Sequence, residues 1–399
     1  MHSRALDGIR GLAIAAVVLH NLGQIHASSG VFGDALQRVA ALGWVGVTLF
    51  FVLSGFLITR GLLLLQSSPA YFQTFFARRA LRIFPLYYVT LAFFFWILPL
   101  LTVPPQPIQD DLSHQIWYWL YLTNWTQHSG LGGMSLPHFW SLAVEEQFYL
   151  AWPFILWRRS PAQVLRICGG LIVLSLVSRV VLTLLETDPM NIYTFTICRM
   201  DALAMGAAAA VWLHDRTLAP PAIFNWRTML LTAAGVLLLG RVLPKAYGMV
   251  DPMGQIVGYP LFGIAFTALL LAALAAEADT RTKWVRSLHW TPLRALGKYS
   301  YAIYIFHVPL HGLVGVPLLQ HFGFPERLAT PHMVGYLIVH AAAVFALAWV
   351  SYHAFEVHFL RLKDRVSAPP APDEAAADVS SRLELDPNRS ATPLPADEK

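Results

Sequence analysis

Ten stretches of predominantly apolar residues constrain what this chain can fold into. A membrane-spanning helix needs about 20 such residues because the hydrocarbon core of a bilayer is about 30 Å thick. The stretches cover residues 6–25, 43–64, 84–103, 139–157, 167–185, 192–212, 229–242, 256–276, 299–319 and 333–355. Hydrophobic residues make up 56% of the chain and charged residues 13%, against roughly 45–50% and 25% in soluble domains. We therefore predict an all-α, polytopic transmembrane bundle of about ten spans.

The basic residues predict how this bundle is oriented, because cytoplasmic loops retain Lys and Arg. With the N-terminus inside, the outer loops contain only Arg38, Arg241, Lys245 and Arg327. The outer segment 104–137 has no Lys or Arg but carries Trp117, Trp119 and Trp125. Both termini are thus predicted to be cytoplasmic. These tryptophans fit either an interfacial belt or a surface that receives a sugar-like acceptor, and residues 116–125 fit a re-entrant or interfacial segment.

The chain divides into residues 1–365, predicted to form one transmembrane domain, and 366–399, predicted to be a disordered cytoplasmic tail. The tail is rich in Pro, Ala, Asp and Glu and has too few large apolar residues to fold. Cys168 and Cys198 lie in apolar stretches, so neither a disulfide framework nor a cysteine-based zinc site is indicated. The net charge is +5, but the basic residues lie in short clusters between apolar stretches, as expected of residues that set membrane topology. Nucleic acid is therefore not an expected partner.

Ionisable residues inside the predicted spans are the next constraint, since each costs at least ~2.5–3.5 kcal/mol to insert. They gather on a few spans as Asp7, Arg10, His20, His138, Glu145, Glu146, Arg179, Arg199, Asp201, His307 and His311. Acids, bases and histidines on several spans predict a shared polar cavity. His307 and His311 are spaced i, i+4, but without acidic support they do not indicate a metal site, and no metal is expected.

His20 is the leading candidate for a general base, because a neutral imidazole accepts a proton near physiological pH. The alternative is that it belongs to a polar helix interface. Glu145 or Glu146 is expected to orient it from across the bundle, with the other member of the pair pointing elsewhere, since helix neighbours are about 100° apart. Ser54 is expected to lie in a tight Ser-Gly turn and to serve packing.

Arg10 and His20 are ten residues apart, roughly 15 Å along a helix, so they cannot touch each other. We expect Arg10 near the cytoplasmic interface and His20 near mid-membrane, which suits a long ligand with an anionic head and a reactive far end. Arg78, Arg79 and Arg82 offer further guanidinium groups for phosphate. The alternative is that this cluster is only a topology signal.

Six segments then carry a family resemblance. They are Leu6-Asp7-Gly8-Ile9-Arg10 through His20, GVTLFFVLSGFLIT at 46–59, the run from Arg78-Arg79 through Arg82-Ile83-Phe84-Pro85-Leu86-Tyr87-Tyr88, FWSLAVEEQFYLAWP at 139–153, Arg199-Met200-Asp201, and LGKYSYAIYIFH at 296–307. In this order the chain resembles the acyltransferase 3 family of integral membrane O-acyltransferases, in a standalone form without a fused hydrolase-like domain. Nine residues separate Arg10 from His20, one fewer than is usual in the family.

The resemblance implies transfer of an acyl group, expected to be acetyl, from cytoplasmic acyl-CoA to a hydroxyl of a carbohydrate or glycosylated small molecule. It carries the catalytic role over to His20, with Arg10 as its essential partner. Glu145 and Glu146 complete the expected catalytic set, and Arg10, Arg78, Arg79 and Arg82 the expected donor-binding set. Membrane lipid and a separate acyl-receiving protein are further expected partners, and the inner (plasma) membrane is the expected location.

A proton-coupled transporter of a small solute is the competing reading, because intramembrane Arg, Asp and His also mark solute pathways. Transporter folds often contain inverted repeats, and no repeated half is apparent in this sequence. We therefore favour the enzyme.

Overall fold

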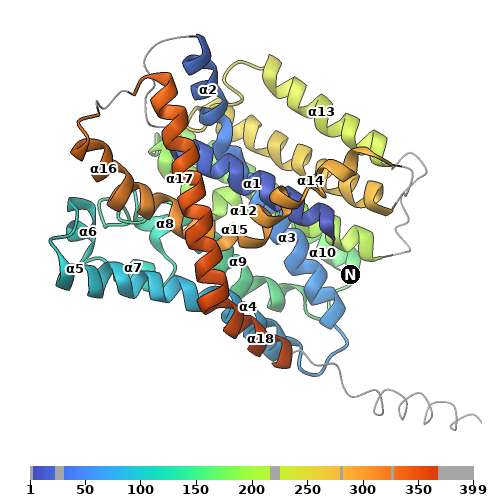
Figure 1. Cartoon of the computed structure of the whole chain (residues 1–399). Coiled ribbons are helices and arrows are strands. Elements are labelled where there is room, and N and C mark those ends of the chain that lie inside the picture. The colour runs from blue at the N-terminus through green and yellow to red at the C-terminus, as the bar shows by residue number, and fades with distance from the viewer. Residues whose placement is uncertain (1–2, 23–30, 216–224, 279–281, 325–327, 367–399) are drawn as a thin grey trace, which may run out of the picture.

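Helices account for the architecture of this protein. The computed structural model describes residues 3–22, 31–215, 225–278, 282–324 and 328–366, and no β-strand occurs among them (Figure 1). The long helices are α1 (Arg4–Leu22), α3 (Val45–Leu65), α4 (Tyr71–Ala92), α9 (Phe139–Leu156), α10 (Pro161–Leu184), α12 (Thr196–His214), α13 (Trp226–Val242), α14 (Tyr259–Ala278), α15 (Thr291–Leu310) and α17 (Thr330–Ser351). The predicted all-α class is confirmed.

Shorter elements connect or extend these helices. The short α-helices are α2 (Val31–Ala41), α5 (Leu98–Leu101), α6 (Gln106–Asp111), α7 (Ile116–Trp119), α8 (Thr123–Thr126), α11 (Pro189–Thr194), α16 (Val316–His321) and α18 (Val357–Val366). Leu42–Trp44 and Trp284–Ser287 are 3₁₀ turns. The π-helical turns Phe93–Ile97, His311–Gly315 and Tyr352–Glu356 each join two α-helices without a break. A fourth π-helical turn, Gly254–Gly258, leads directly into α14.

Eight helical stretches in the described residues are long and apolar enough to cross a membrane. They are Arg4–Leu22, Gly33–Leu65, Tyr71–Leu101, Pro161–Leu184, Pro189–His214, Gly254–Glu277, Thr291–His321 and Thr330–Leu362. The other two predicted spans correspond to α9, whose apolar character Glu145 and Glu146 reduce, and to α13, which has 17 residues. A multi-pass helical bundle is thus confirmed, whereas the count of ten spans stays a prediction. The predicted tail, apart from Val366, lies outside the described residues.

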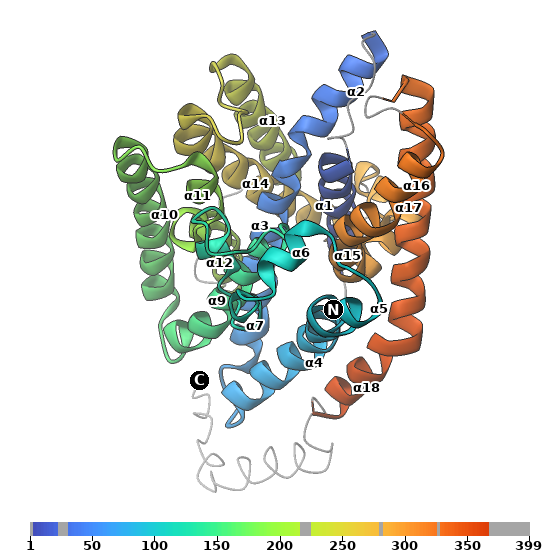
Figure 2. The same cartoon turned by 90° about the vertical axis from the view of Figure 1, so that its left-hand side faces the viewer.

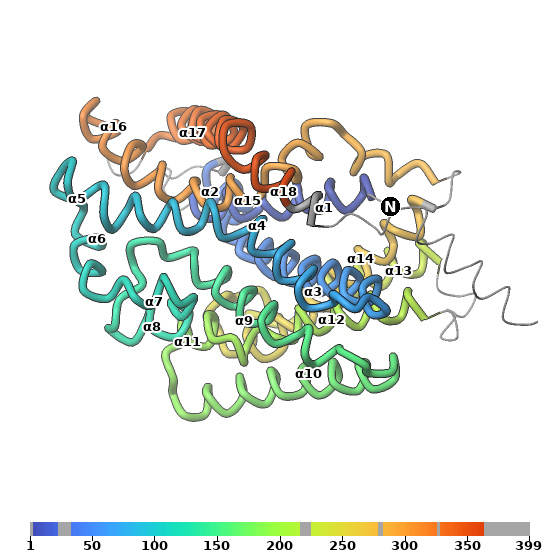
Figure 3. The backbone as a smooth tube through the Cα atoms, turned by 90° about the horizontal axis from the view of Figure 1, so that it is seen from below, coloured from blue at the N-terminus to red at the C-terminus, as the bar shows by residue number. Residues whose placement is uncertain are grey.

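The helices differ in how deeply they are buried. α10 and α17 lie at opposite edges of the bundle in two views, with α1, α3, α12 and α15 between them (Figures 2 and 3). Large apolar side chains of both outer helices are exposed, among them Val173, Val177, Leu184, Ile338, Val339 and Val350. Surfaces of this kind face lipid in a membrane protein. Most residues of α3 and α12 are buried, so the polar side chains on the inner helices are shielded from lipid.

Glycine lets α3 and α12 pack backbone to backbone at the centre of the bundle. A Cβ on Gly55 would lie 1.9 Å from the Leu203 carbonyl oxygen, and a Cβ on Gly206 would lie 2.0 Å from that of Val52. Small residues commonly allow such close approaches between membrane helices. The Ser54-Gly55 pair lies within the continuous helix α3, so the predicted tight turn is wrong. The close contact with α12 therefore leaves room only for glycine at position 55.

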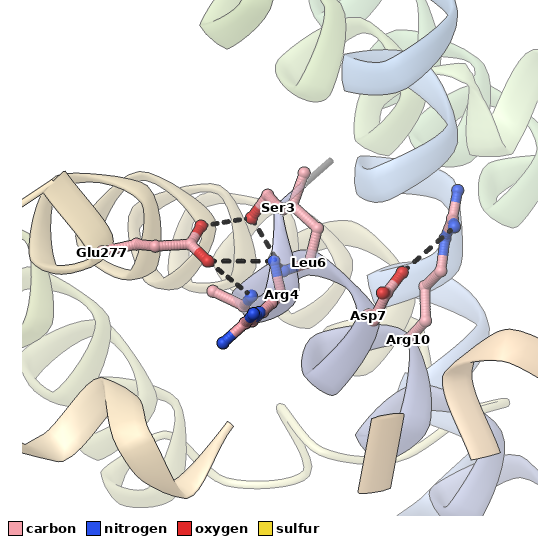
Figure 4. A network of polar contacts seen from close by, with 7 residues as sticks. Ser3, Arg4, Leu6, Asp7, Arg10 and Glu277 are labelled. Carbon is pink, nitrogen blue, oxygen red and sulfur yellow. Dashed lines mark hydrogen bonds and ion pairs between the residues drawn. The ribbon is translucent and has the colours of Figure 1, made fainter. Parts of the chain in front are cut away.

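Segments that the charge pattern assigns to the inner side meet at one end of the bundle. The carboxylate of Glu277, at the end of α14, accepts hydrogen bonds from the Ser3 hydroxyl (2.5 Å) and the Arg4 backbone N–H (2.9 Å). Figure 4 shows this carboxylate beside the first turn of α1. A Cβ on Gly8 would touch the Leu288 carbonyl, which places the segment before α15 at the same end. Which membrane face this end occupies remains a prediction.

Candidate active site

A cavity of about 110 Å³ lies between α1, α3, α4, α9 and α15. Its polar lining consists of Arg10, Ser54, Arg79, Arg82, Ser141, Glu145, Glu146, Tyr149, Ser300, Tyr301 and Tyr304. Apolar residues of α3 complete the wall, including Phe50 and Phe51. Ionisable groups are concentrated here on helices that are distant in sequence, as the predicted shared cavity requires. The cavity is therefore the candidate active site.

Arg10, Arg79 and Arg82 line this cavity, and the first two are held by specific neighbours. The Arg10 guanidinium lies 3.9 Å from the Asp7 carboxylate one turn earlier on α1, and the two side chains point toward each other (Figure 4). Arg79 lies over the Tyr149 ring, 5.5 Å from its centroid, and over the Phe75 ring at 5.9 Å. Guanidinium groups fixed in this way suit phosphate, because their planar N–H groups bind its oxygens two at a time.

A hydrogen-bonded triad joins α3 to α9 in the same cavity. The Ser54 hydroxyl donates to Glu145 Oε1 at 2.9 Å, and the Tyr149 hydroxyl lies 2.9 Å from both Ser54 Oγ and Glu145 Oε2. Ser54 is therefore part of a hydrogen-bond network in the cavity, which its sequence neighbours do not reveal. The spacing of Glu145 and Tyr149, four residues apart on a helix, is the sequence signal for their contact.

The two glutamates correct one expectation. Both Glu145 and Glu146 line the cavity, so the prediction that one of them points elsewhere is wrong. Neighbours on a helix do diverge by about 100°, but the cavity borders both side chains. It extends from Ser54 on α3 to Tyr301 on α15.

The predicted donor-binding residues separate into two groups. Arg10, Arg79 and Arg82 line the cavity, whereas Arg78 is absent from its lining. On α4, Arg82 lies in angle between Arg79, about 60° away, and Arg78, about 40° away on the other side. The cavity borders the Arg79 side of this arc.

His20 lies away from the cavity, near the C-terminal end of α1. A Cβ on Gly43, just before α3, would lie 2.9 Å from His20 Cβ, which places His20 level with the start of α3. Ser54 follows Gly43 by 11 residues, so it lies roughly 16 Å further along the bundle axis. These contacts place His20 relative to α3, and its expected position near mid-membrane stays a prediction.

The partner of His20 also differs from expectation. Its Nδ1 lies 3.1 Å from the Ala40 carbonyl oxygen, whereas the Glu145 carboxylate binds Ser54 and Tyr149. The prediction that a glutamate orients His20 is thus wrong. A carbonyl oxygen accepts but cannot donate, so in the neutral ring Nδ1 carries the proton and the lone pair is on Nε2. That tautomer is the one a general base needs.

Between the cavity and His20 lies a set of polar side chains from α1, α9 and α15. Tyr304 Oη lies 2.6 Å from Ser141 Oγ and 2.7 Å from the His138 carbonyl oxygen. The His138 ring is 5.0 Å from the His307 ring, and His307 Nε2 lies 3.1 Å from the Asn21 amide nitrogen. We call Ser141, Tyr304, His138, His307 and Asn21 the polar seam. The sequence singled out His138 and His307, but it did not show that these five residues connect.

The predicted histidine pair on α15 is engaged elsewhere. His307 Nδ1 lies 2.7 Å from the Tyr304 carbonyl oxygen, and His311 Nδ1 lies 2.6 Å from the Tyr336 hydroxyl. Within the described part of the chain, no cluster of three or more His, Cys, Asp or Glu side chains is arranged to hold a metal ion.

The remaining intramembrane charges pair or pack. Arg179 of α10 donates to the Cys198 carbonyl oxygen and lies 2.8 Å from the Asp201 carboxylate, with both side chains buried. Arg199 donates to the Thr48 hydroxyl and lies over the Tyr259 ring, 4.3 Å from its centroid. These contacts join α10, α12, α14 and α3, so the three charged residues hold the bundle together beside the cavity.

The segment 104–137 is organised around the buried carboxylate of Asp111. Asp111 accepts hydrogen bonds from the backbone N–H groups of Gly133 and Ser135 and from the Tyr118 hydroxyl. Burial and this neighbouring carboxylate raise the pKa of Tyr118 well above its ordinary value, so its hydroxyl remains a donor. Trp119 stacks on Tyr88 of α4 and on Trp96. The segment is therefore anchored to α4 through Trp119.

Comparison with known proteins gives matches over most of the chain. The peptidoglycan O-acetyltransferase OatA of Listeria monocytogenes is 29% identical over 373 residues, 88% of this chain and 55% of its own length. The putative peptidoglycan O-acetyltransferase YrhL of Bacillus subtilis is 29% identical over 374 residues, 88% of this chain and 54% of its own. For O-acetyltransferase OatA of Staphylococcus aureus the values are 27% over 330 residues, 76% and 50%.

The chain thus spans about half the length of the curated relatives it matches. No solved structure matches it. The sequence profile of the acyltransferase domain family aligns with residues 3–353, nearly all of the helical bundle. This match includes every residue of the cavity and the polar seam, and the resemblance noted from six separate segments is confirmed. The chain belongs to the acyltransferase 3 family of membrane acyltransferase domains.

Proposed function

We propose that this protein moves an acetyl group from acetyl-CoA to a hydroxyl of a carbohydrate. The observation that carries the proposal is the convergence of Arg10, Arg79 and Arg82 with Glu145 in one cavity inside a membrane bundle. The printed names of the relatives, which describe O-acetyltransferases of peptidoglycan, support acetyl as the group and a glycan as the acceptor. The inner membrane is the proposed location.

The donor end of the reaction belongs to the arginines. The phosphates of acetyl-CoA carry several negative charges, and Arg10, Arg79 and Arg82 offer guanidinium groups from two helices. Charge-assisted hydrogen bonds of this kind contribute about 1.5–3 kcal/mol each. We assign these three residues to donor binding, with the cytoplasm as the side from which the donor enters. Arg78, outside the cavity lining, has at most a supporting electrostatic effect.

The acceptor end belongs to His20. Its Nδ1 is engaged by the Ala40 carbonyl, so Nε2 is positioned to take the proton from an acceptor hydroxyl as that hydroxyl attacks the thioester carbonyl. The C–S bond of the thioester then breaks, and the thiolate leaves as CoA after taking up a proton. Glu145 is assigned to the donor cavity rather than to His20.

A reconstituted assay tests the proposal. The full chain in liposomes receives radiolabelled acetyl-CoA and either soluble peptidoglycan fragments, a glycosylated small molecule, or no acceptor. Labelled O-acetyl product with release of CoA is expected for a glycan acceptor. A separate acyl-receiving protein as the acceptor is tested by adding a membrane extract and locating the label by electrophoresis.

Two results contradict the proposal. The first is binding of acetyl-CoA without any acylated product under every acceptor condition. The second is proton-coupled solute flux across the liposome membrane without product, which is the behaviour expected of a transporter.

A further inference from the structure

The donor cavity and His20 are separated in this structure, so the acyl group has to travel from one to the other. Arg10 lines the cavity, and His20 lies ten residues further along the same regular helix, about 15 Å away. If the arginines hold the phosphates and His20 acts at the thioester, the reactive end of the donor must cover that distance inside the protein. This inference rests on the proposed function.

The polar seam lies in the space that has to be crossed. Ser141 and Tyr304 line the cavity and are bonded to each other at 2.6 Å. Tyr304 Oη also meets the backbone carbonyl of His138, which precedes Glu145 by seven residues and so lies about 10 Å further along α9. The seam therefore begins at the cavity and continues towards the end of the bundle where His20 lies.

The far end of the seam reaches the neighbour of His20. The rings of Tyr304 and His307 are 5.5 Å apart. His307 Nδ1 faces the Tyr304 carbonyl, so its Nε2 accepts the hydrogen bond from the Asn21 amide. Asn21 follows His20 directly in α1. The chain of contacts therefore runs from the donor cavity to Asn21, the residue next to His20 in α1.

One atom of the seam points to a ligand. His138 is 95% buried, since its exposed fraction is 5%. Its Nε2 lies 3.3 Å from the Ile305 carbonyl oxygen, and its Nδ1 has no hydrogen-bond partner. A buried imidazole nitrogen left with a free lone pair is costly. An N–H group arriving along the seam would satisfy it.

We infer that the polar seam binds the acyl-bearing arm of the donor, with Ser141 and Tyr304 parting to admit it. The arm of CoA is a flexible chain that carries amide N–H and C=O groups and ends in the sulfur that holds the acyl group. An amide N–H of the arm donates to His138 Nδ1, and the Tyr304 hydroxyl donates to an amide or thioester carbonyl. The thioester then lies beside Asn21, within reach of His20.

Disulfide trapping tests how far the sulfur of CoA reaches, without any need for an acceptor. The background variant is Cys168→Ala with Cys198→Ala, since these are the two cysteines of the chain. Single variants Asn21→Cys, Ser54→Cys and Ser175→Cys are then treated with CoA 2-pyridyl disulfide, whose leaving group is small. The protein thiolate attacks the CoA sulfur, a mixed protein–CoA disulfide forms, and pyridine-2-thiolate leaves. Intact mass reports the product.

The expected result is rapid trapping in Asn21→Cys that excess acetyl-CoA prevents. Ser175→Cys is the matched control, because Ser175 is fully buried in α10 and lies outside the cavity and the seam. It should remain unmodified. Trapping in Ser54→Cys without trapping in Asn21→Cys overturns the inference, because the arm then ends inside the cavity. That outcome leaves CoA as the donor, so the proposed function survives.

Steady-state kinetics provide a second, independent test. Tyr304→Phe keeps the ring and removes the hydroxyl, and we expect the KM for acetyl-CoA to rise about 3- to 10-fold, the worth of one neutral hydrogen bond. The KM for the acceptor should not change. Unchanged acetyl-CoA kinetics in Tyr304→Phe count against the inference. Failure of both Asn21→Cys and Ser54→Cys to form a mixed disulfide contradicts both the inference and CoA as the donor.

Discussion

Arg10 and His20 lie ten residues apart on the regular helix α1, yet Arg10 lines the central cavity and His20 contacts the Ala40 carbonyl instead. Ten residues turn an α-helix by about 1000°, which leaves His20 about 80° from the face of Arg10. The spacing with nine intervening residues therefore separates donor binding from proton transfer in angle as well as in depth. Substitutions at the two positions should have different kinetic signatures.

Replacing His20 by alanine should remove a catalytic base while leaving the cavity intact. We expect His20→Ala to lower the rate of acyl transfer about 10²- to 10⁴-fold, the usual contribution of a general base. The affinity for CoA should be unchanged, because His20 is outside the cavity lining. Turnover in liposomes and calorimetric titration with CoA check the two expectations. His321→Ala, at an exposed site on α16, is the control, and a wild-type rate in His20→Ala would falsify the assignment.

The arginines of the cavity should act on donor binding. We expect Arg79→Ala and Arg10→Ala each to raise the KM for acetyl-CoA about 10- to 100-fold, as charge-assisted hydrogen bonds are lost. Lysine should rescue in part, since it keeps the charge but loses the planar fork. Arg78→Ala should change the KM less than about threefold. Equal changes of the KM in Arg78→Ala and Arg79→Ala would contradict the assignment of donor binding to the arginines that line the cavity.

Gly55 should be intolerant of any side chain. A Cβ there would lie 1.9 Å from the Leu203 carbonyl oxygen, whereas a Cβ on Gly61 of the same helix meets no atom within 4 Å. Overpacking typically costs about 1–3 kcal/mol, so Gly55→Ala should lower the thermal midpoint in detergent and Gly61→Ala should not. Aggregation during heating, followed by size-exclusion chromatography, measures both. Equal midpoints for the two variants would contradict the close contact between α3 and α12.

The predicted orientation can be tested by labelling single cysteines in intact cells with an impermeant reagent. Ser129 and Ala162 are suitable because both are exposed. The nearby positions Gln127 and Ser160 are less suitable, because Gln127 is buried and Ser160 caps α10. Ser129→Cys should react from outside, and Ala162→Cys should react only after the membrane is opened. The opposite pattern would reverse the assignment of both termini to the cytoplasm and the entry side of the donor.

The sequence alone determined the class of fold and most of the charged lining of the site. Apolar windows of about 20 residues can be accommodated only as membrane helices, and each of the ten windows corresponds to a helix. The cost of inserting charge singled out Arg10, Glu145 and Glu146, and the resemblance carried by six segments named the family. These inferences succeeded because they depend on local composition and order.

Tertiary structure decided which of these residues meet. Ser54 looked like packing because its partners, Glu145 and Tyr149, are about 90 residues away on another helix. The separation of His20 from the cavity follows from how α1 is rotated against α3, which close contacts at Gly43 and Gly46 determine. Rotation and depth depend on how neighbouring helices pack. The connection of the polar seam therefore required the assembled bundle.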